Sequence, residues 1–339
     1  MDILLDIVLL LIGFVLLIKG ADYFVVGSSA IAKKLKVPSI VVGLTIVAVG
    51  TSLPELAVST FAAAKGSNAI ALSNVIGSNI FNALMVLGIT ALFSTINVKK
   101  SILRREIPFL LVITALLVFL IGDALWFGNI IGKINIFSFA NGEATIGEVG
   151  RIDGILLFVL FVGFIAWTVK YAIKERDNME DESDAEIISN SKCALYIIGG
   201  AAAIVIGGDV VVDCAKSLAM SAGMSETLVG LTIVAMGTSL PELVTSAVAA
   251  KKGEADIAVG NVVGSNIANI LLVLGLSAAI SPVEVTMMSL IDTGVSLIAA
   301  VVIFIVSGTS NKIRKKEGIF LVLIYAVYMA YIICRQYAC

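Results

Sequence analysis

Long apolar runs follow one another along the whole chain, and each is long enough to cross a lipid bilayer. A transmembrane helix needs about 20 predominantly apolar residues, and ten such runs are read from the sequence. They cover residues 3–25, 38–64, 69–94, 103–122, 151–173, 193–218, 227–250, 255–280, 283–307 and 317–335. The first run lacks a basic segment before it, so we expect it to stay in the mature protein and not to be a signal peptide. The pattern predicts an all-α polytopic membrane protein with ten transmembrane helices.

Composition supports this interpretation and removes several classes of chemistry. The 339 residues are 59% hydrophobic and only 14% charged, whereas soluble domains carry about a quarter charged residues. The chain has no histidine, and its four cysteines show neither metal-ligand spacing nor a disulfide framework. Zinc, haem and histidine-base chemistry are therefore not expected, and no cofactor, nucleic acid or obligatory protein partner is inferred.

The basic residues indicate how the chain is oriented in the membrane. Of the 23 lysines and arginines, 17 fall in every second loop, for example in "KKLK" at 33–36, "KKSILRR" at 99–105 and "KIRKK" at 312–316. Basic loops stay in the cytoplasm, so we expect both termini outside a plasma membrane. The mixed-charge segment 174–192 then becomes a cytoplasmic linker, and the glycine-rich segment 123–150 lies outside.

The chain contains an internal repeat at an offset of 187 residues. "VGLTIVAVGTSLPEL" at 42–56 and "VGLTIVAMGTSLPEL" at 229–243 differ at one position, and residues 42–92 align with 229–279 without a gap at 33 identities in 51 positions. Each copy belongs to a unit of five apolar runs, 1–173 and 193–339. Because five is odd, equivalent helices enter the membrane from opposite sides, which is an inverted repeat of the kind that builds secondary transporters.

Each repeat places helix-breaking and acidic residues within a predicted span. Pro54 lacks an N–H and its ring crowds the carbonyl of Gly50, so carbonyls between Val47 and Gly50 are expected to leave the helical ladder. Thr51 and Glu55 are four residues apart and share one helix face. Ser52 is the next residue along the helix after Thr51. The second copy offers the same arrangement through Gly237, Thr238, Ser239, Pro241 and Glu242.

The next span in each repeat adds amides and hydroxyls at helical spacing. These are Asn74, Ser78 and Asn82 in the first copy and Asn261, Ser265 and Asn269 in the second. Gly77 and Gly264 are expected to let neighbouring helices pack closely. Together the two halves predict a pocket of carboxylate, hydroxyl, amide and carbonyl oxygens, a donor set that suits Ca²⁺ and Na⁺.

Two carboxylates buried in a membrane need compensation, and several occupants would supply it. One divalent ion, two monovalent ions or two protons would each neutralise the pair, and competition among them is a physical basis for antiport. An enzyme would need a nucleophile with a base or a metal with an activated water, and the sequence offers no suitable histidine or cysteine. An ion channel is the other alternative, although channel filters are usually built by rotational symmetry and not by an inverted repeat.

The paired motifs "VGLTIVAVGTSLPEL" and "SNVIGSNIFN", repeated in inverted halves, resemble the alpha repeats of the sodium/calcium exchanger family within the cation/Ca²⁺ exchanger superfamily. The resemblance covers all ten predicted spans and points to a minimal prokaryotic type. It implies alternating access with exchange of about three Na⁺ for one Ca²⁺. In this mechanism the long first and sixth spans would slide across a core formed by spans 2, 3, 7 and 8.

The resemblance also implies roles for individual residues. A calcium site would use Glu55 and Glu242 with help from Thr51 and Thr238. Sodium sites would use the carbonyls of Ala48 and Ala235 with Ser52, Ser78, Ser239 and Ser265, and the central positions would be Asn82 and Asn269. Some potassium-dependent relatives have aspartate where Asn269 stands, so we expect exchange without K⁺. Ca²⁺/H⁺ antiport and K⁺-dependent Na⁺/Ca²⁺ antiport remain the alternatives.

Other polar residues in the spans are expected to be structural. Asn74, Asn79, Asn261 and Asn266 are expected to hydrogen-bond the broken helices. Asp22 and Asp209 occupy equivalent repeat positions in the sequence. We expect them to be structural as well, with Asp22 pairing with Lys19 three residues before it.

Overall fold

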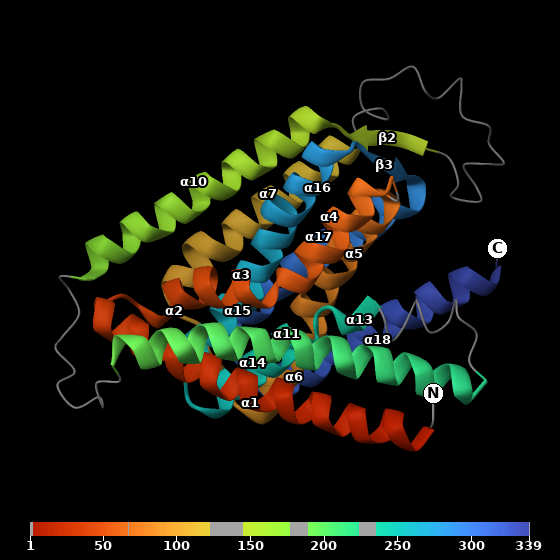
Figure 1. The fold of residues 1–339 in the computed structure, drawn as a ribbon. Helices are drawn as coiled ribbons and strands as arrows, with labels where there is room; N and C mark the ends of the chain where they lie inside the picture. The colour runs from red at the N-terminus through yellow and green to blue at the C-terminus, as the bar shows by residue number, and fades with distance from the viewer. Residues whose placement is uncertain (1–2, 67, 123–144, 177–188, 224–234, 339) are drawn as a thin grey trace.

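The computed structural model describes residues 3–66, 68–122, 145–176, 189–223 and 235–338. Within these ranges the chain is almost entirely helical (Figure 1). The α-helices are α1 (Ile3–Leu35), α2 (Ser39–Val42), α3 (Ala48–Thr51), α4 (Leu53–Ala64), α5 (Asn68–Ile80), α6 (Leu87–Phe93), α7 (Ile107–Ile121), α10 (Arg151–Arg176), α11 (Asn190–Ser221), α13 (Ala235–Gly237), α14 (Leu240–Lys251), α15 (Ala255–Ala268), α16 (Gly275–Ile280), α17 (Met287–Ser310) and α18 (Lys315–Ala338). The described residues also contain four π-helical segments: η1 (Gly43–Val47), η2 (Phe81–Val86) and η6 (Asn269–Leu274) each connect two α-helices, and η3 (Ile102–Glu106) leads into α7.

The helices confirm most of the predicted spans. Among the described residues, seven helices are long and apolar enough to cross a membrane, and the bent pair 39–51 and 53–64 makes an eighth. The predicted span 103–122 corresponds to η3 followed by α7, whose α-helical part has only 15 residues. The predicted span 227–250 begins outside the described residues and continues as α13 and α14. The count of ten therefore stays a prediction.

The first and sixth spans are longer than their apolar runs. α1 has 33 residues and α11 has 32, whereas the hydropathy pattern placed the ends of these spans at 3–25 and 193–218. The two helices run side by side along one flank of the molecule (Figure 1). Glycines allow their close approach, because a Cβ built on Gly200 would lie 2.8 Å from the carbonyl oxygen of Gly20. Small residues at such contacts are the usual means of packing membrane helices.

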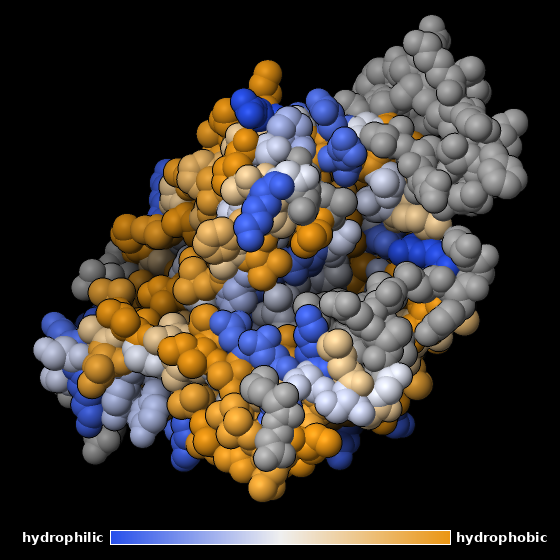
Figure 2. All heavy atoms as spheres, turned by 45° about the vertical axis from the view of Figure 1, so that its right-hand side comes forward, coloured by the Kyte–Doolittle hydropathy of each residue, from blue (hydrophilic) through white to orange (hydrophobic). Residues whose placement is uncertain are grey.

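The interior of the bundle is formed by α5 and α15 with their π-helical continuations. Twelve of the fourteen residues of α15 are buried, and α5 packs against α4, α17 and η6. The outer helices instead expose large apolar side chains, such as Ile152 on α10 and Val327 on α18. Figure 2 shows such hydrophobic side chains across much of the visible surface. This distribution is expected where lipid, not water, covers the protein.

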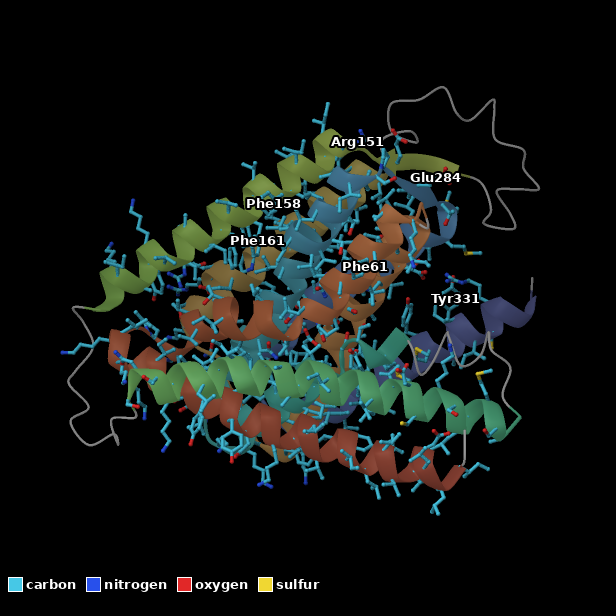
Figure 3. The ribbon with its side chains drawn as sticks, in the orientation of Figure 1. Phe61, Arg151, Phe158, Phe161, Glu284 and Tyr331 are labelled. Carbon is cyan, nitrogen blue, oxygen red and sulfur yellow. The ribbon has the colours of Figure 1, made fainter. Side chains whose placement is uncertain are left out.

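Two short strand pairs connect loops that are distant in sequence. β2 (Thr145–Val149) pairs antiparallel with β3 (Val283–Thr286), and β1 (Ile96–Asn97) pairs antiparallel with β4 (Lys312–Ile313). Figure 3 shows Arg151 and Glu284 beside the first of these sheets, at one end of the molecule. The pairings agree with the predicted alternation of loops between the two membrane faces, since each sheet joins loops assigned to one face.

The two repeat glycines, Gly77 and Gly264, occupy different surroundings. A Cβ on Gly264 would lie 2.7 Å from the Cβ of Ala48 and 2.8 Å from the Leu44 backbone, whereas a Cβ on Gly77 would meet no described atom within 4 Å. The predicted close packing is therefore confirmed at Gly264. Gly77 shows no such contact with the described residues.

Replacing Gly264 with alanine is expected to destabilise the protein, because backbone atoms cannot yield as a flexible side chain does. The cost should be about 1–3 kcal/mol, as for other overpacked sites. Gly77→Ala is the matched control and should change stability by less than about 0.5 kcal/mol. Thermal unfolding of the two purified variants in detergent measures both, and equal losses would contradict the prediction.

Candidate ion-binding site

Two helices break at equivalent positions of the repeat. α3 ends at Thr51, Ser52 leaves the helical conformation (φ −82°, ψ 9°) and α4 begins at Leu53, with a bend of 47° between the two halves of the span. In the second repeat α13 gives way to α14 at Ser239 (φ −93°, ψ 6°). Pro54 follows the first break and cannot donate a hydrogen bond to the Gly50 carbonyl. The breaks therefore lie where the motif chemistry predicts them.

Glu55 lies in the first turn of α4, and Glu242, the equivalent residue of the second repeat, lies in the first turn of α14. Both side chains are fully buried, at 0% exposure. The Ser239 hydroxyl donates to Oε1 of Glu55 over 3.0 Å, and the Ser52 hydroxyl donates to Oε1 of Glu242 over 3.2 Å. Ser78 donates a further bond of 3.3 Å to Oε1 of Glu55. Each carboxylate is thus held by a serine of the opposite repeat.

The second oxygen of each carboxylate has no hydrogen-bond partner among the described residues. Oε2 of Glu55 and Oε2 of Glu242 are both buried and unpaired. An unpaired buried carboxylate oxygen is costly in an apolar environment unless a cation binds it. The arrangement therefore presents two carboxylate oxygens that are available to a cation.

A hydrogen-bond network supports each half-site and repeats in both. Asn74 donates from Nδ2 to the Ser59 hydroxyl over 2.9 Å and to the Glu55 carbonyl over 3.3 Å. Its counterpart Asn261 donates to the Ser246 hydroxyl over 2.9 Å and to the Glu242 carbonyl over 3.4 Å. The predicted structural role of these asparagines is therefore confirmed. They hold the first turns of α4 and α14 against α5 and α15.

The threonine of each motif donates a hydrogen bond to an asparagine of the other repeat. Thr51 donates to Oδ1 of Asn261 over 3.0 Å, and Thr238 donates to Oδ1 of Asn74 over 3.3 Å. Thr51 is fully buried and also lies 3.4 Å from the Ser265 hydroxyl. Both hydroxyls are thus engaged with side chains of the opposite repeat.

The Ala48 carbonyl differs from the prediction that it leaves the helical ladder. It accepts the backbone N–H of Ser52 at 3.0 Å and the Ser265 hydroxyl at 3.4 Å, and the Thr51 hydroxyl, which donates to Asn261, lies 3.3 Å from it. It stays paired because Pro54 removes only the N–H that would reach Gly50. The equivalent Ala235 begins α13.

Asn82 and Asn269 lie at the π-helical turns η2 and η6, a feature that sequence reasoning missed. η2 packs against α14, which carries Glu242, and η6 packs against α4, which carries Glu55. Both asparagines are fully buried, and within the described part of the chain Oδ1 and Nδ2 of Asn82 and Oδ1 of Asn269 have no hydrogen-bond partner. π-Helical turns often occur at functional sites. The two turns begin 188 residues apart, one more than the repeat offset, and each contains the equivalent asparagine of its repeat.

A cavity of about 920 Å³ opens beside the first break, and a smaller one of about 220 Å³ adjoins it. Pro54, Asp209 and Thr238 line both, and Phe61 and Lys65 line the larger one. Phe61 lies on α4, toward the end of the molecule that holds the β2–β3 sheet (Figure 3). The cavity approaches the site from that end. Sequence reasoning did not find it.

The atoms of the described residues that this pocket offers to a cation are unpaired carboxylate and amide oxygens. No group of three or more histidine, cysteine, aspartate or glutamate side chains occurs among the described residues, so the pocket does not resemble a zinc or iron centre. Carboxylate, amide and hydroxyl oxygens suit hard cations such as Ca²⁺ and Na⁺. Pairing across an inverted repeat places this pocket where secondary transporters hold their ions.

Fold and site together define a secondary cation transporter, and comparison with known proteins assigns its family. The family model described as "Sodium/calcium exchanger protein" matches residues 5–170 and 192–334. The chain therefore belongs to the sodium/calcium exchanger family, which is a family of transporters and not of enzymes.

Relatives match along most of the chain. The sodium/calcium exchanger MaX1 of Methanosarcina acetivorans is 35% identical over 339 aligned positions, covering 95% of this chain and 96% of the relative. The inner membrane protein YrbG of Escherichia coli is 36% identical over 82% of this chain and 80% of its own. A structure of the sodium-calcium exchanger NCX_Mj soaked with Na⁺ and Ca²⁺ superposes with a TM-score of 0.77 at 29% identity, over 96% of this chain and 98% of that chain.

Ser52 and Ser239, which each donate to the glutamate of the opposite repeat, provide a direct test of the site. Ser52→Ala and Ser239→Ala should each lower the apparent affinity for Ca²⁺ about 10-fold to 100-fold, because a hydrogen bond to a charged group contributes roughly 1.5–3 kcal/mol. Thr114→Ala is the control, since that buried hydroxyl donates only to the Leu110 carbonyl of its own helix. The concentration dependence of Ca²⁺ transport measures the effect. Unchanged affinity in both serine variants would contradict the assignment.

Proposed function

We propose that this protein exchanges Na⁺ for Ca²⁺ by alternating access, with about three Na⁺ per Ca²⁺ and no requirement for K⁺. The observation that carries the proposal is the pair of buried glutamates, each held by a serine of the opposite half and each leaving Oε2 unpaired. A divalent cation between Glu55 and Glu242 would neutralise both carboxylates. Sodium ions would occupy the same oxygens and those of their neighbours.

The predicted ligands divide between the two carboxylates and the surrounding groups. Calcium would bind Glu55 and Glu242 with Thr51 and Thr238. Sodium would bind near the Ala48 and Ala235 carbonyls with Ser52, Ser78, Ser239 and Ser265, and Asn82 and Asn269 would hold the centre. The burial of these serines and asparagines supports this division.

The proposal includes an arrangement in the membrane. The five-span units 1–173 and 193–339 form the two halves, and 174–192 is a cytoplasmic linker between them. Both termini lie outside a plasma membrane. The strand pairings support the alternation of loops, and the basic residues support the direction.

Uptake of ⁴⁵Ca²⁺ into proteoliposomes loaded with Na⁺ tests the function. Uptake should require an outward Na⁺ gradient and should persist when K⁺ is left out of all solutions. Uptake that follows a pH step and ignores Na⁺ would instead establish Ca²⁺/H⁺ antiport. Uptake that appears only with K⁺ present would establish the K⁺-dependent mode, and uptake without any countercation would favour a channel.

Exchange of about three Na⁺ for one Ca²⁺ moves one net positive charge per cycle, so transport should respond to voltage. An inside-positive potential should accelerate Ca²⁺ uptake by Na⁺-loaded vesicles several-fold, since net charge leaves during uptake. An inside-negative potential should slow it. Initial rates at potentials set with an ionophore measure the response. A rate independent of potential would indicate electroneutral exchange and contradict this stoichiometry.

A further inference from the structure

A pair of asparagines links the two half-sites across the centre of the bundle. Nδ2 of Asn79 donates to the backbone carbonyl of Asn266 over 3.2 Å, and Nδ2 of Asn266 donates to the backbone carbonyl of Asn79 over 3.2 Å. Both side chains are 3% exposed. The two bonds are equivalent under the repeat and join α5 to α15.

The amide of Asn79 has only one orientation that satisfies its partners. A carbonyl accepts hydrogen bonds and never donates them, so the NH₂ end of Asn79 must face the Asn266 carbonyl. Its Oδ1 then faces Nδ2 of Asn269 and accepts from it over 3.1 Å. With that nitrogen engaged, Oδ1 of Asn269 is left buried and without a partner among the residues that the structure describes.

The other half lacks this second bond. Oδ1 of Asn266 is unpaired, and both side-chain atoms of Asn82 are unpaired among the described residues. One of the two central asparagines is thus oriented by its neighbour and the other is not. A neutral amide binds a cation only through its oxygen, so this orientation has a direct consequence for ion binding.

We propose that Asn79 is a positioning residue that holds the Asn269 amide with its oxygen free for a cation, an inference that rests on the proposed function. Without Asn79, the Asn269 amide can rotate and present its NH₂ group, which repels a cation. Asn79 itself does not touch the ion. It acts through Asn269 alone.

Asn266→Ala is the matched control for Asn79→Ala. Each variant removes one amide-to-carbonyl bond between the halves, but only Asn79→Ala releases Asn269. The KM for Ca²⁺ in Na⁺-dependent uptake should rise about fivefold more in Asn79→Ala than in Asn266→Ala, the effect of one net hydrogen bond. Maximal rates should change equally. Asn79→Ser, whose shorter side chain cannot reach Asn269, replaces the alanine variant if that variant does not fold.

A second background separates positioning from a general structural role. A carboxylate has no NH₂ end, so Asn79→Ala should cost little additional affinity when Asn269→Asp is already present. Equal KM values for Asn79→Ala and Asn266→Ala, or an undiminished cost in the Asn269→Asp background, would overturn the proposal. Absence of Na⁺-dependent uptake in the wild type would instead contradict the proposed function.

A different observation concerns Asp22, which pairs with Lys252 and not with Lys19 as predicted. Nζ of Lys252 lies 2.8 Å from Oδ1 of Asp22 and joins the end of α14 to α1. Both residues have counterparts 187 positions away, Asp209 on α11 and Lys65 at the end of α4. The repeat therefore contains the same acid–base pair twice.

The second copy of the pair is open. Lys65 and Asp209 both line the cavity of about 920 Å³, and no ion pair joins these two described residues. The first copy is closed by an ion pair and the second copy is separated across a cavity. Equivalent residues in an inverted repeat are expected to exchange surroundings when the site faces the other side of the membrane.

We infer that the two pairs alternate, with Asp22–Lys252 closed when the cavity beside Lys65 is open and Lys65–Asp209 closed when access is reversed. Asp22 and Lys252 remain 41% and 33% exposed, so each pair should shift the populations of the two states a few-fold and not lock one of them. α1 and α11 each carry one acid, so both pairs respond when this helix pair moves.

Labelling of the cavity tests the alternation without measuring transport. Ala57 lines the cavity, so Ala57→Cys in a variant without the four native cysteines reports access from outside. Lys252→Gln should slow modification by a membrane-impermeant thiol reagent about threefold, because the pair that closes the opposite side is lost. Lys65→Gln should not slow it, and Lys251→Gln controls for the change in surface charge.

A variant in which the acidic and basic residues of the closed pair are exchanged completes the test. Asp22→Lys combined with Lys252→Asp should restore the modification rate. Equal slowing in Lys65→Gln and Lys252→Gln, or no restoration in the exchanged pair, would overturn the inference. Because labelling needs no ion gradient, its outcome is independent of which cations are transported.

Discussion

Glu55→Gln and Glu242→Gln are each expected to reduce Na⁺-dependent Ca²⁺ uptake at least about a hundredfold, more than the loss of a supporting residue around a metal ion. Glutamine removes one of the two negative charges that would compensate a divalent cation. It also places an NH₂ group where the carboxylate presents an oxygen. Initial rates of ⁴⁵Ca²⁺ uptake into Na⁺-loaded proteoliposomes measure the loss.

Glu284→Gln is the matched control for this substitution. Glu284 is an exposed glutamate on β3, in the β2–β3 sheet at one end of the molecule (Figure 3). Its replacement should leave uptake unchanged. The amount of each variant in the vesicles is quantified, and uptake is compared at equal amounts of protein. Wild-type rates in both Glu55→Gln and Glu242→Gln would place the site elsewhere.

The stability of the protein is expected to depend on bound cations, and this is the second large effect. Two fully buried carboxylates, each with an oxygen that has no partner among the described residues, destabilise the folded state when no cation is present. Binding of Ca²⁺ at about one hundred times its dissociation constant should add roughly 2.7 kcal/mol of stability. Thermal unfolding in detergent, with and without Ca²⁺ in Na⁺-free buffer, measures the increment.

The glutamine variants should differ from the wild type both in their unfolding temperature without cations and in the stabilisation that Ca²⁺ adds. Glu55→Gln removes a buried charge, so the variant should unfold at a higher temperature than the wild type in cation-free buffer. It should then gain little from Ca²⁺. A wild-type protein with the same unfolding temperature in both buffers would contradict the assignment. So would a Glu55→Gln variant that retains the full increment.

Much of this protein was predictable because hydropathy and the repeat are written along the chain. Apolar runs of bilayer length determine where helices cross, and the starts of α1, α10 and α15 fall within a few residues of the predicted spans. The burial of Glu55 and Glu242 was predictable because each motif lies within an apolar run, and the cost of a carboxylate in hydrocarbon is what makes an ion-binding role the prediction for them. The break at Pro54 follows from the missing N–H of proline.

Partners across the two halves could not be predicted from the chain alone. The repeat shows that Ser52 and Ser239 are equivalent, but it contains no information on which glutamate each one approaches. Folding places each serine against the carboxylate of the other half, over 3.2 Å and 3.0 Å. The same applies to Asp22, whose partner is Lys252 and not the nearby Lys19.

The asymmetry between the repeats was likewise decided by the tertiary structure. The sequence determined by itself that two nearly identical motifs exist, that both are buried in the membrane, and that their oxygens suit hard cations. Only the tertiary structure decided that Gly264 is tightly packed while Gly77 is not, and that one acid–base pair is closed while its copy lines a cavity. The physical reason is that two nearly identical segments fold into one shared bundle, in which a cavity borders the first break, so similar sequences meet unequal neighbours.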